Sequence, residues 1–596
     1  MIKLGFWMGI PAVLSLLTGC RPTLLQRVLE HPPTASAASE AGGAGAQAAV
    51  FRDAAPASGF HYQWTIPGKR PLTILQTIGN GCAWLDYNND GNLDALLVGT
   101  DHIALYKGDG RGHFTDVSHE TGLDTLRGHF LGCAVGDYDN DGYDDLYLSG
   151  YHTGILLHNE HGKGFRDVTR EAGLTSQPWG TSCAFADIDN DGRLDLYVGN
   201  YVLFDKTTPQ LCAISSIPTA CSPGVYKPGR GILYHNLGNG KFQDITQKWG
   251  AAAVSGYCLG AAFADYNGTG RPSLALANDE TNGDLMRNEG KKFKNVSKAA
   301  GTATDLRGSV YAGMGIDWGD YDNDGKLDLV LGTFEQQTKC VFRNHDSLFT
   351  EESARLGLDP AIPWVAFGVK WLDFDNDGWL DLIISEGHVM DNIADVNRAF
   401  DNADIPGYAK HPSYRQSIQL FHNTAGTRFT DSSSGLDAYA HRPIVGRGLA
   451  VGDYDNDGRV DVLVVDSEGV PLLLHNETAP VGHWLSFTLQ GTRSNRDGYG
   501  ALVTVQTSTP AGGLTQTRLC HADGSYLSSS DKRVHVGLGA AIVADTVRVR
   551  WPSGQVDTFH GLRGDAAYRV REGNKEARPL KALGLSKAPA MRHPHG

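Results

Sequence analysis

Six short acidic segments carry the residues with the most evident chemistry. Each has acidic or amide side chains at positions 1, 3 and 5, a glycine at position 6 and an aspartate at position 9, as in DYDNDGYDD from Asp137. Alternating oxygen ligands of this kind can converge on one cation, and the glycine permits a sharp turn. Calcium prefers such hard oxygen ligands, and a backbone carbonyl at position 7 supplies one more.

The spacing therefore predicts about six structural calcium ions, one for each intact segment. The predicted ligands are Asp86, Asn88, Asp90 and Asp94; Asp137, Asp139, Asp141 and Asp145; Asp187, Asp189, Asp191 and Asp195; Asp320, Asp322, Asp324 and Asp328; Asp373, Asp375, Asp377 and Asp381; and Asp453, Asp455, Asp457 and Asp461. A metal-free polar turn is the alternative, but it explains one copy better than six. A seventh copy, DYNGTGRPS from Asp265, has Thr269 and Ser273 at ligand positions, so we expect it to bind weakly or to be empty.

These segments are not EF-hands, and the residues around them predict short strands. An EF-hand needs a glutamate at position 12, where this chain has an apolar residue such as Leu148. Glycine-bounded apolar runs flank each segment, as in GCAVG before it and LYLSG after it. A third run such as LLHNEHG follows, and then a fourth that begins with Phe-x-Asp. One unit thus has about four strands, which is the size of a propeller blade.

The number of strands predicts a closed ring. There are seven acidic segments and seven third strands, but only six strands that begin with Phe-x-Asp or a near variant follow them. The missing copy is Phe51-Arg52-Asp53, which precedes the first segment and would complete the last blade. Closure removes unpaired strand edges, whereas an open solenoid has no use for such an exchange. We therefore expect an all-β protein with a seven-bladed β-propeller over residues 51–480.

These units resemble FG-GAP or VCBS-type repeats, as in the integrin α-subunit propeller. The resemblance covers about residues 51–480 and is carried by the acidic segments between paired strands. It implies calcium in those loops, in agreement with the spacing of the ligands.

A different pattern follows Asn476 and predicts a small antiparallel β-domain over residues 483–572. Four motifs occur there in order: GTRSNRDGYGA, SYLSSS, VHVGLG and VRWPSG. They resemble the ASPIC/UnbV domain, and the order of propeller and domain is similar to the cartilage acidic protein-like family, of which this chain looks like a bacterial member. Cys520-His521-Ala522 departs from the charged or polar run more usual there. Residues 573–596 are expected to be a disordered tail.

The N-terminus is typical of an exported lipoprotein. Lys3 precedes an apolar stretch, and Leu17-Thr18-Gly19-Cys20 fits a lipobox. We expect residues 1–20 to be a signal peptide with this lipobox, Cys20 to carry the lipid, and the alanine-rich residues 21–50 to be a flexible linker. A plain secretory signal with a chance cysteine is the alternative. The expected location is the outer membrane or cell surface, otherwise periplasmic or secreted, with membrane contact only through the lipid.

Two insertions interrupt the repeats, at Tyr201–Arg230 and His388–Gln416. The first contains Cys212 and Cys221, which we expect to form a disulfide in an exported protein. Cys82, Cys133 and Cys183 occupy a position that is apolar in the other units, so core packing is favoured over a metal cluster. Cys258, Cys340 and Cys520 have no assignment. His388 in SEGHVMDN is interpreted as a structural polar contact, with a functional role as the alternative.

Composition and motifs narrow the function. Aspartate and glutamate outnumber lysine and arginine by 67 to 52, so a basic nucleic-acid surface is not expected. No convincing nucleophile–base arrangement or nucleotide-binding motif is present. A monomeric calcium-binding adhesion or ligand-binding protein, for an extracellular or envelope protein or glycan, is therefore favoured over an enzyme. A polysaccharide-active enzyme such as a lyase, or an envelope assembly factor, are the alternatives.

Overall fold

The structure is a computed structural model that describes residues 51–402, 411–479, 481–510 and 512–580. The predicted signal peptide, lipid-bearing Cys20 and linker, and residues 581–596 of the predicted tail, lie outside the described residues.

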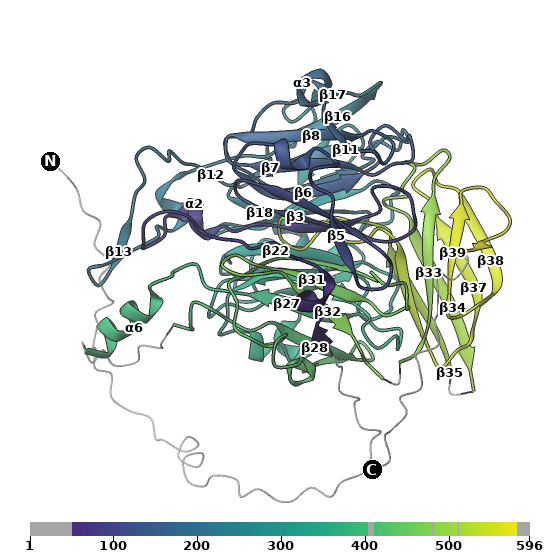
Figure 1. Ribbon diagram of the computed structural model, residues 1–596. Helices are drawn as coiled ribbons and strands as arrows, with labels where there is room; N and C mark the ends of the chain where they lie inside the picture. The colour runs from purple at the N-terminus through teal and green to yellow at the C-terminus, as the bar shows by residue number, and fades with distance from the viewer. Residues whose placement is uncertain (1–50, 403–410, 480, 511, 581–596) are drawn as a thin grey trace, which may run out of the picture. The chain divides into compact units, whose positions relative to one another are not determined.

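Seven four-stranded antiparallel sheets account for most of the described chain (Figure 1). In chain order the first four sheets are β2–β5 (Cys82–Leu85, Asp94–Val98, Ile103–Gly108, Phe114–Asp116), β6–β9 (Phe130–Gly136, Asp145–Gly150, Thr153–Asn159, Phe165–Asp167), β10, β11, β16 and β17 (Gly180–Ala186, Asp195–Asn200, Ile232–Gly238, Lys241–Asp244) and β18–β21 (Cys258–Ala264, Ser273–Asn278, Asp284–Asn288, Phe293–Asn295). The others are β22–β25 (Gly313–Gly319, Asp328–Thr333, Val341–His345, Leu348–Glu351), β26–β29 (Ala366–Leu372, Asp381–Glu386, Gln419–Thr424, Arg428–Asp431) and β30, β31, β32 and β1 (Gly446–Gly452, Asp461–Asp466, Leu472–Asn476, Phe51–Asp53). We call these sheets blades one to seven.

The ring closes as predicted from the displaced Phe-x-Asp strand. β1 pairs with β32, so Phe51 lies opposite Asn476 and completes blade seven. The first strand of each blade contacts the first strands of both neighbouring blades, and β30 contacts β2. These first strands therefore line the axis of a β-propeller. Because they are covered on both sides, their residues are almost all buried, which is why the sequence shows continuous apolar runs there.

Aromatic residues at position 2 of the acidic loops hold neighbouring blades together. Tyr321 in the loop of blade five stacks on Trp371 of blade six, with ring centroids 5.9 Å apart. Tyr454 of blade seven stacks in the same way on Trp84 of blade one, at 6.0 Å. Such buried aromatic pairs contribute packing area between neighbouring blades.

A second β-domain follows the propeller. Its strands form two sheets, in the orders β36-β33-β39-β40 and β35-β34-β37-β38. The strands are β33 (His483–Gln490), β34 (Leu502–Thr509), β35 (Gly512–Leu519), β36 (Val534–Gly539), β37 (Val543–Arg550), β38 (Val556–Arg563), β39 (Ala566–Arg571) and β40 (Arg578–Pro579).

Two expectations for this domain need correction. β33 and β39 pair in parallel, so the first sheet is mixed and not purely antiparallel. Between β33 and β39 the chain forms the other sheet and also adds β36 to the first, which gives the long crossover that parallel pairing requires. β40 pairs with β39 as far as Pro579, so Arg578 and Pro579, which were predicted to lie in a disordered tail, belong to a strand.

The two insertions lie at the propeller end opposite the acidic loops, because both join the second and third strands of a blade. The first contains β12 (Val202–Leu203), β13 (Cys212–Ile214), β14 (Ile217–Thr219) and β15 (Lys227–Pro228), and the second contains α6 (Ile393–Asn402). Ile393 and Val396 of α6 cluster with Ile214 and Ile217 of the first insertion. Figure 1 shows β13 and α6 on one side and β33 to β39 on the other.

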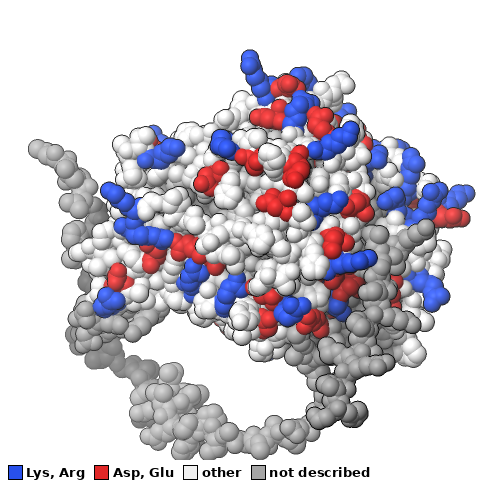
Figure 2. Space-filling view, viewed as in Figure 1, with Lys and Arg blue, Asp and Glu red and all other residues white. Residues whose placement is uncertain are grey.

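Short helices join other strands: α1 (Ala55–Ser58), α2 (Ile74–Thr77), α3 (Thr169–Ala172), α4 (Ser297–Ala300) and α5 (Ser353–Leu356). Among the described residues, no helix is both long enough and apolar enough to span a membrane. Acidic and basic side chains are interspersed over the face seen in Figure 2.

The cysteines divide into one bonded pair and a buried set. Cys212 and Cys221 form a disulfide that ties together the first insertion. The other described cysteines are free and buried, and they are Cys82, Cys133, Cys183, Cys258, Cys340 and Cys520. Cys82, Cys133 and Cys183 lie in the inner strands and pack in the core, as their apolar counterparts in other blades predicted.

Candidate functional site

The acidic loops share one backbone conformation that the sequence pattern anticipates. In the loop from Asp137, one carboxylate oxygen accepts the amide of Gly142 at 2.7 Å and the other accepts the amide of Asp141 at 2.9 Å. Gly142 has φ of 98°, a value at which glycine avoids the strain of a side chain. The loop therefore turns sharply around its first carboxylate and brings positions 1, 3 and 5 to one side.

Position 4 is an asparagine with positive φ in all six intact loops, and in five of them its side chain joins adjacent blades; Asn456 Nδ2 makes no such bond. Asn140 Nδ2 donates to the carbonyl of Gly192 in the next loop at 2.8 Å, and Asn376 Nδ2 donates to Gly458 at 2.8 Å. Asparagine tolerates the left-handed conformation and supplies the donor as well. Sequence reasoning treated this residue only as part of a turn.

The aspartate at position 9 fastens the loop to the third strand of its own blade. In blade six, Asp381 accepts the amide of Phe374 at 3.1 Å with one oxygen and the amide of Asn423 at 2.7 Å with the other. Asp381 is fully buried. Position 9 therefore has a structural role that stands whether or not it is also a metal ligand.

The structure brings the predicted ligands of each intact loop together, and several of their oxygens lack partners. Five buried carboxylate oxygens accept no hydrogen bond, one in each of five intact loops: Asp141 Oδ2, Asp189 Oδ1, Asp320 Oδ1, Asp373 Oδ1 and Asp455 Oδ1. Burial, and then the carboxylate of Asp195, raise the pKa of Asp187 to about 8. Crowded carboxylates of this kind are unfavourable as anions unless a cation neutralises them.

A basic residue on the third strand faces the loop in each of the six blades with an intact loop. His158 Nδ1 lies 3.3 Å from both Asp139 and Asp145, and His422 Nε2 lies 3.2 Å from Asp375. His235 and His475 are placed in the same way. In blade five a permanent cation replaces the imidazole, with Arg343 Nε 2.6 Å from Asp322, and in blade one Lys107 Nζ is 3.1 Å from Asp90. The intact loops are therefore not equivalent. In the sequence, each of these basic residues stands directly before an asparagine or glycine near the end of the third strand. That repeated position could have predicted them, but the sequence analysis did not single it out.

The altered loop from Asp265 is neutralised in another way. Arg550 of β37 donates to Asp265 Oδ2 at 3.0 Å. Ser273 at position 9 keeps only the structural role and accepts the amide of Asn288 at 3.1 Å. The prediction that this loop binds metal weakly or not at all is untested, and the guanidinium beside Asp265 is consistent with it.

A buried asparagine at the end of the third strand forms another bond between blades. Asn423 Nδ2 donates to Tyr321 O of blade five and to Leu380 O of its own blade, both at 2.8 Å. Five other blades have the same arrangement, with Asn159, Asn236, Asn288, Asn344 and Asn476. Blade one has Gly108 at this position.

A segment of the second domain lies along the propeller axis. We call Asp523–Asp531, which contains the SYLSSS motif, the axial segment. It makes hydrogen bonds of 2.9 to 3.2 Å with the inner strand of every blade. Its backbone pairs with that of blades one, two and five: Ser529 N donates to Cys82 O, and the carbonyls of Ser529, Leu527 and Ser525 accept from Trp84 N, Cys133 N and Ile316 N. Side chains take part in the other four bonds: Leu527 N donates to Ser182 Oγ of blade three, and Asp523 Oδ2, Asp523 O and Ser530 Oγ accept from Phe263 N of blade four, Lys370 Nζ of blade six and Val451 N of blade seven. The segment therefore fills the axial channel.

The tip of the axial segment reaches the end of the propeller that carries the insertions. Tyr526 is fully buried, its hydroxyl donates to Ile78 O at 3.0 Å, and its ring meets Phe367 edge to face at 4.9 Å. The guanidinium of Arg447 lies over the same Phe367 ring, 3.9 Å from its centroid, and donates to the carbonyl of His388 at 3.3 Å. Sequence reasoning used SYLSSS only to recognise the domain.

Basic residues of the second domain also contact the acidic loops directly. Arg518 donates to Gly378 O at 3.0 Å, and Arg533 donates to Asn456 Oδ1 at 2.6 Å. Lys532 pairs with Asp144 and Asp497. The loops are therefore the surface on which the second domain packs. A cavity of about 120 Å³ remains between them, lined in part by Asp317, Lys370 and Arg518.

Family models match both parts of the chain. The model described as FG-GAP-like repeat matches residues 86–148, 137–198, 265–331 and 320–384, and the ASPIC and UnbV model matches residues 491–577. The fold and the loops thus define the class: a β-propeller protein of FG-GAP-like repeats with a C-terminal ASPIC/UnbV domain.

Within that class the chain is similar to cartilage acidic protein 1. It is 22% identical to the Xenopus tropicalis protein over 379 residues, which are 52% of this chain and 58% of the frog protein. It is 29% identical to the Mus musculus protein over 190 residues, 29% of this chain and 28% of the mouse protein. The chain therefore spans less than two thirds of the length of these relatives.

Solved structures with a similar chain path are more distant. An Agrocybe aegerita lectin that recognises non-reducing terminal N-acetylglucosamine is 12% identical, with a TM-score of 0.38, over 66% of this chain and 86% of the lectin. YCF48 from Cyanidioschyzon merolae is 10% identical, with a TM-score of 0.36, over 70% of this chain and 99% of that protein.

Proposed function

We propose that this protein is a calcium-stabilised binding protein outside the cytoplasm, anchored by a lipid on Cys20. Its class indicates a ligand-binding module, and the ligand we propose is an extracellular or envelope protein or glycan. About six calcium ions would hold the propeller in shape, and the chain would act as a monomer.

The state of the loop carboxylates supports the calcium part of this proposal. Oxygens of Asp141, Asp189 and Asp373 are buried without any hydrogen-bond partner, although each lies in a loop with three other ligands. An unpaired buried acceptor costs about 1–3 kcal/mol, and more when it is charged. A calcium ion accepts oxygen ligands from flexible loops of this type, so it would remove that cost.

The side of the propeller with the two insertions is the surface we assign to the ligand. The C-terminal domain covers the acidic loops and fills the axis. The opposite end of the propeller carries the two insertions, and long loops on a rigid scaffold are where binding residues commonly lie. Leu203, Leu211 and Val225 of the first insertion are about half exposed, at 49%, 45% and 52%. Apolar side chains on a disulfide-tied insertion favour contact with a partner.

The observation that carries the proposal is the convergence of four oxygen side chains in each intact loop, and calcium binding tests it. Each independent site would stabilise the folded protein by about 2.7 kcal/mol at 100 times its dissociation constant. We expect the melting temperature to rise by many degrees between excess chelator and millimolar calcium. Asp141→Ala should remove most of one site's share, whereas Thr269→Ala in the altered loop should change little.

The ligand is sought with the same protein on glycan and secreted-protein arrays, with and without calcium. Binding that needs calcium and that is weakened by Leu211→Asp, but not by Val556→Asp on the C-terminal domain, would support the assignment to the insertions. Coincident melting curves in chelator and calcium, with fewer than about three ions bound per chain, would overturn the calcium part of the proposal. A ligand weakened equally by both substitutions would overturn the location.

A further inference from the structure

A cluster of two histidines and one glutamate lies at the insertion end of the propeller, remote from the acidic loops. Glu335 follows β23 of blade five, His388 follows β27 of blade six, and His411 lies where the second insertion returns towards β28. Two adjacent blades and one insertion thus bring these residues together across 76 positions of sequence.

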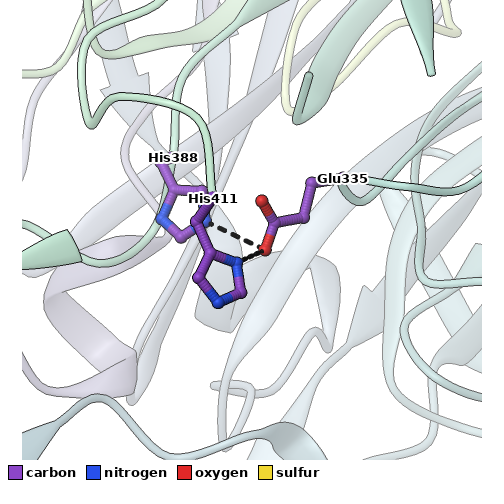
Figure 3. A group of neighbouring side chains, drawn as sticks. All are labelled: Glu335, His388 and His411. Atoms are coloured by element: carbon purple, nitrogen blue, oxygen red, sulfur yellow. Dashed lines mark hydrogen bonds and ion pairs between the residues drawn. The ribbon is translucent and has the colours of Figure 1, made fainter. Parts of the chain in front are cut away.

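The donor atoms converge on one point. Nδ1 of His411 contacts Oε1 of Glu335, and Nε2 of His388 lies 3.6 Å from the same oxygen (Figure 3). One nitrogen of each histidine and one oxygen of the glutamate all lie within 4.8 Å of one another. Three donor atoms gathered in this way could hold one small cation.

The interior of the cluster is unsatisfied. His388 is 0% and Glu335 is 7% exposed, yet His388 Nε2 and Glu335 Oε2 have no hydrogen-bond partner. Buried polar atoms without partners are rare in folded proteins and call for an explanation such as an ion. The His411 side chain is 25% exposed, so the cluster is open to solvent on that side.

The surrounding structure fixes the orientation of His388. The amide of Met390 donates to Nδ1 at 3.0 Å, and Arg447 holds the His388 carbonyl. Nε2 therefore faces Glu335. Because Nδ1 accepts a hydrogen bond, the neutral ring carries its proton on Nε2, and an ion bound there would replace that proton and release it to solvent.

We propose that Glu335, His388 and His411 form a binding site for a divalent transition-metal ion of the zinc type, separate from the acidic loops. Two imidazole nitrogens and one carboxylate oxygen suit zinc and its neighbours, whereas calcium needs about six to eight oxygens. The described part of the chain supplies three ligands, and a fourth position could be taken by water or by a group of a bound partner. The site would lie on the end of the propeller that carries the two insertions.

Cobalt, which substitutes for zinc and absorbs visible light, is the probe. The full chain is first treated with chelator and then saturated with calcium, so that the acidic loops are occupied. Cobalt is then titrated, with absorption and bound metal measured together. Wild type should bind one cobalt ion that His411→Ala and Glu335→Gln do not bind. His422→Ala is the matched control, because His422 faces carboxylates in a calcium loop, and it should keep the ion.

Two outcomes would overturn the proposal. One is wild-type protein that binds no cobalt under saturating calcium, a result that does not depend on how any variant folds. The other is a cobalt ion that His411→Ala retains and His422→Ala loses, which would place the ion in a loop. Thermal melting of each variant shows that a lost ion does not reflect lost folding. Failure of the cobalt site leaves the calcium proposal intact, because calcium melting is measured separately.

Discussion

Substitution of Asn423 tests how strongly the blades depend on one another. Its Nδ2 donates to Tyr321 O and Leu380 O, and its Oδ1 accepts the amide of Gly426 at 2.9 Å. Asn423→Ala leaves these three groups without a partner, and Asn423 itself is fully buried. At about 1 kcal/mol or more for each unpaired group, the folded protein should lose about 3 kcal/mol.

Chemical denaturation followed by tryptophan fluorescence, at fixed calcium, measures this loss. Thr424→Ala is the matched control, because Thr424 is next to Asn423 in the strand but has an exposed side chain. This substitution should change the free energy of unfolding by less than about 0.5 kcal/mol. Asn423→Asp keeps the size of the side chain but replaces a donor by an acceptor, so it should destabilise at least as much as alanine. An alanine variant within about 0.5 kcal/mol of wild type would refute the view that this bond couples the blades.

Three further predictions concern the axial segment, the disulfide and acid stability. Tyr526→Ala should cost about 3–5 kcal/mol in denaturant unfolding, as for other large buried aromatics, whereas Tyr526→Phe, which loses only the hydroxyl bond to Ile78, should cost about 1–3 kcal/mol; equal costs would contradict the packing described. Cys212→Ser should speed proteolysis within the first insertion while leaving the propeller's melting temperature nearly unchanged, because the disulfide closes a span of only nine residues, and an equally protected insertion would count against it. Although burial raises the pKa of Glu572, hydrogen bonds from Ser553 and the amides of residues 492–494 lower it to about 2, so its stabilisation is present above about pH 4.5 and is lost as the pH falls towards 2; Glu572→Gln should flatten the stability curve in that window.

The repeat content of the fold was predictable because it depends on local patterns. The acidic loop, the alternating strands and the displaced Phe51-Arg52-Asp53 strand each appear in short stretches of sequence, and together they require a ring. The interpretation of Cys82 as a core residue also followed from comparison among the repeats, and the structure confirms it.

The other features depend on contacts between residues far apart in the chain. Nothing near Tyr526 or Leu527 indicates that they enter a channel formed by seven other segments. The parallel pairing of β33 with β39 likewise depends on how the intervening strands fold. The sequence shows a histidine such as His158 at the same position of several third strands. Whether its imidazole faces the acidic loop depends on the register of the strand. The cluster of Glu335 and His411 joins residues from two blades, so no single repeat displays it.

The axial segment has a consequence for the order in which the molecule is assembled. The backbone amide of Cys82 in the first inner strand donates to Ser528 Oγ, 446 residues later in the chain. At a synthesis rate of about 5–20 residues per second, that strand waits roughly 20–90 s for its final neighbour. Contacts of such long range form late, because the intervening chain must first be brought together. Until then, the axis of every early blade is an unfilled apolar surface. The ASPIC/UnbV domain, which is made after the propeller, therefore completes it, and a chain interrupted before residue 523 would leave that surface open to aggregation or to capture by a chaperone.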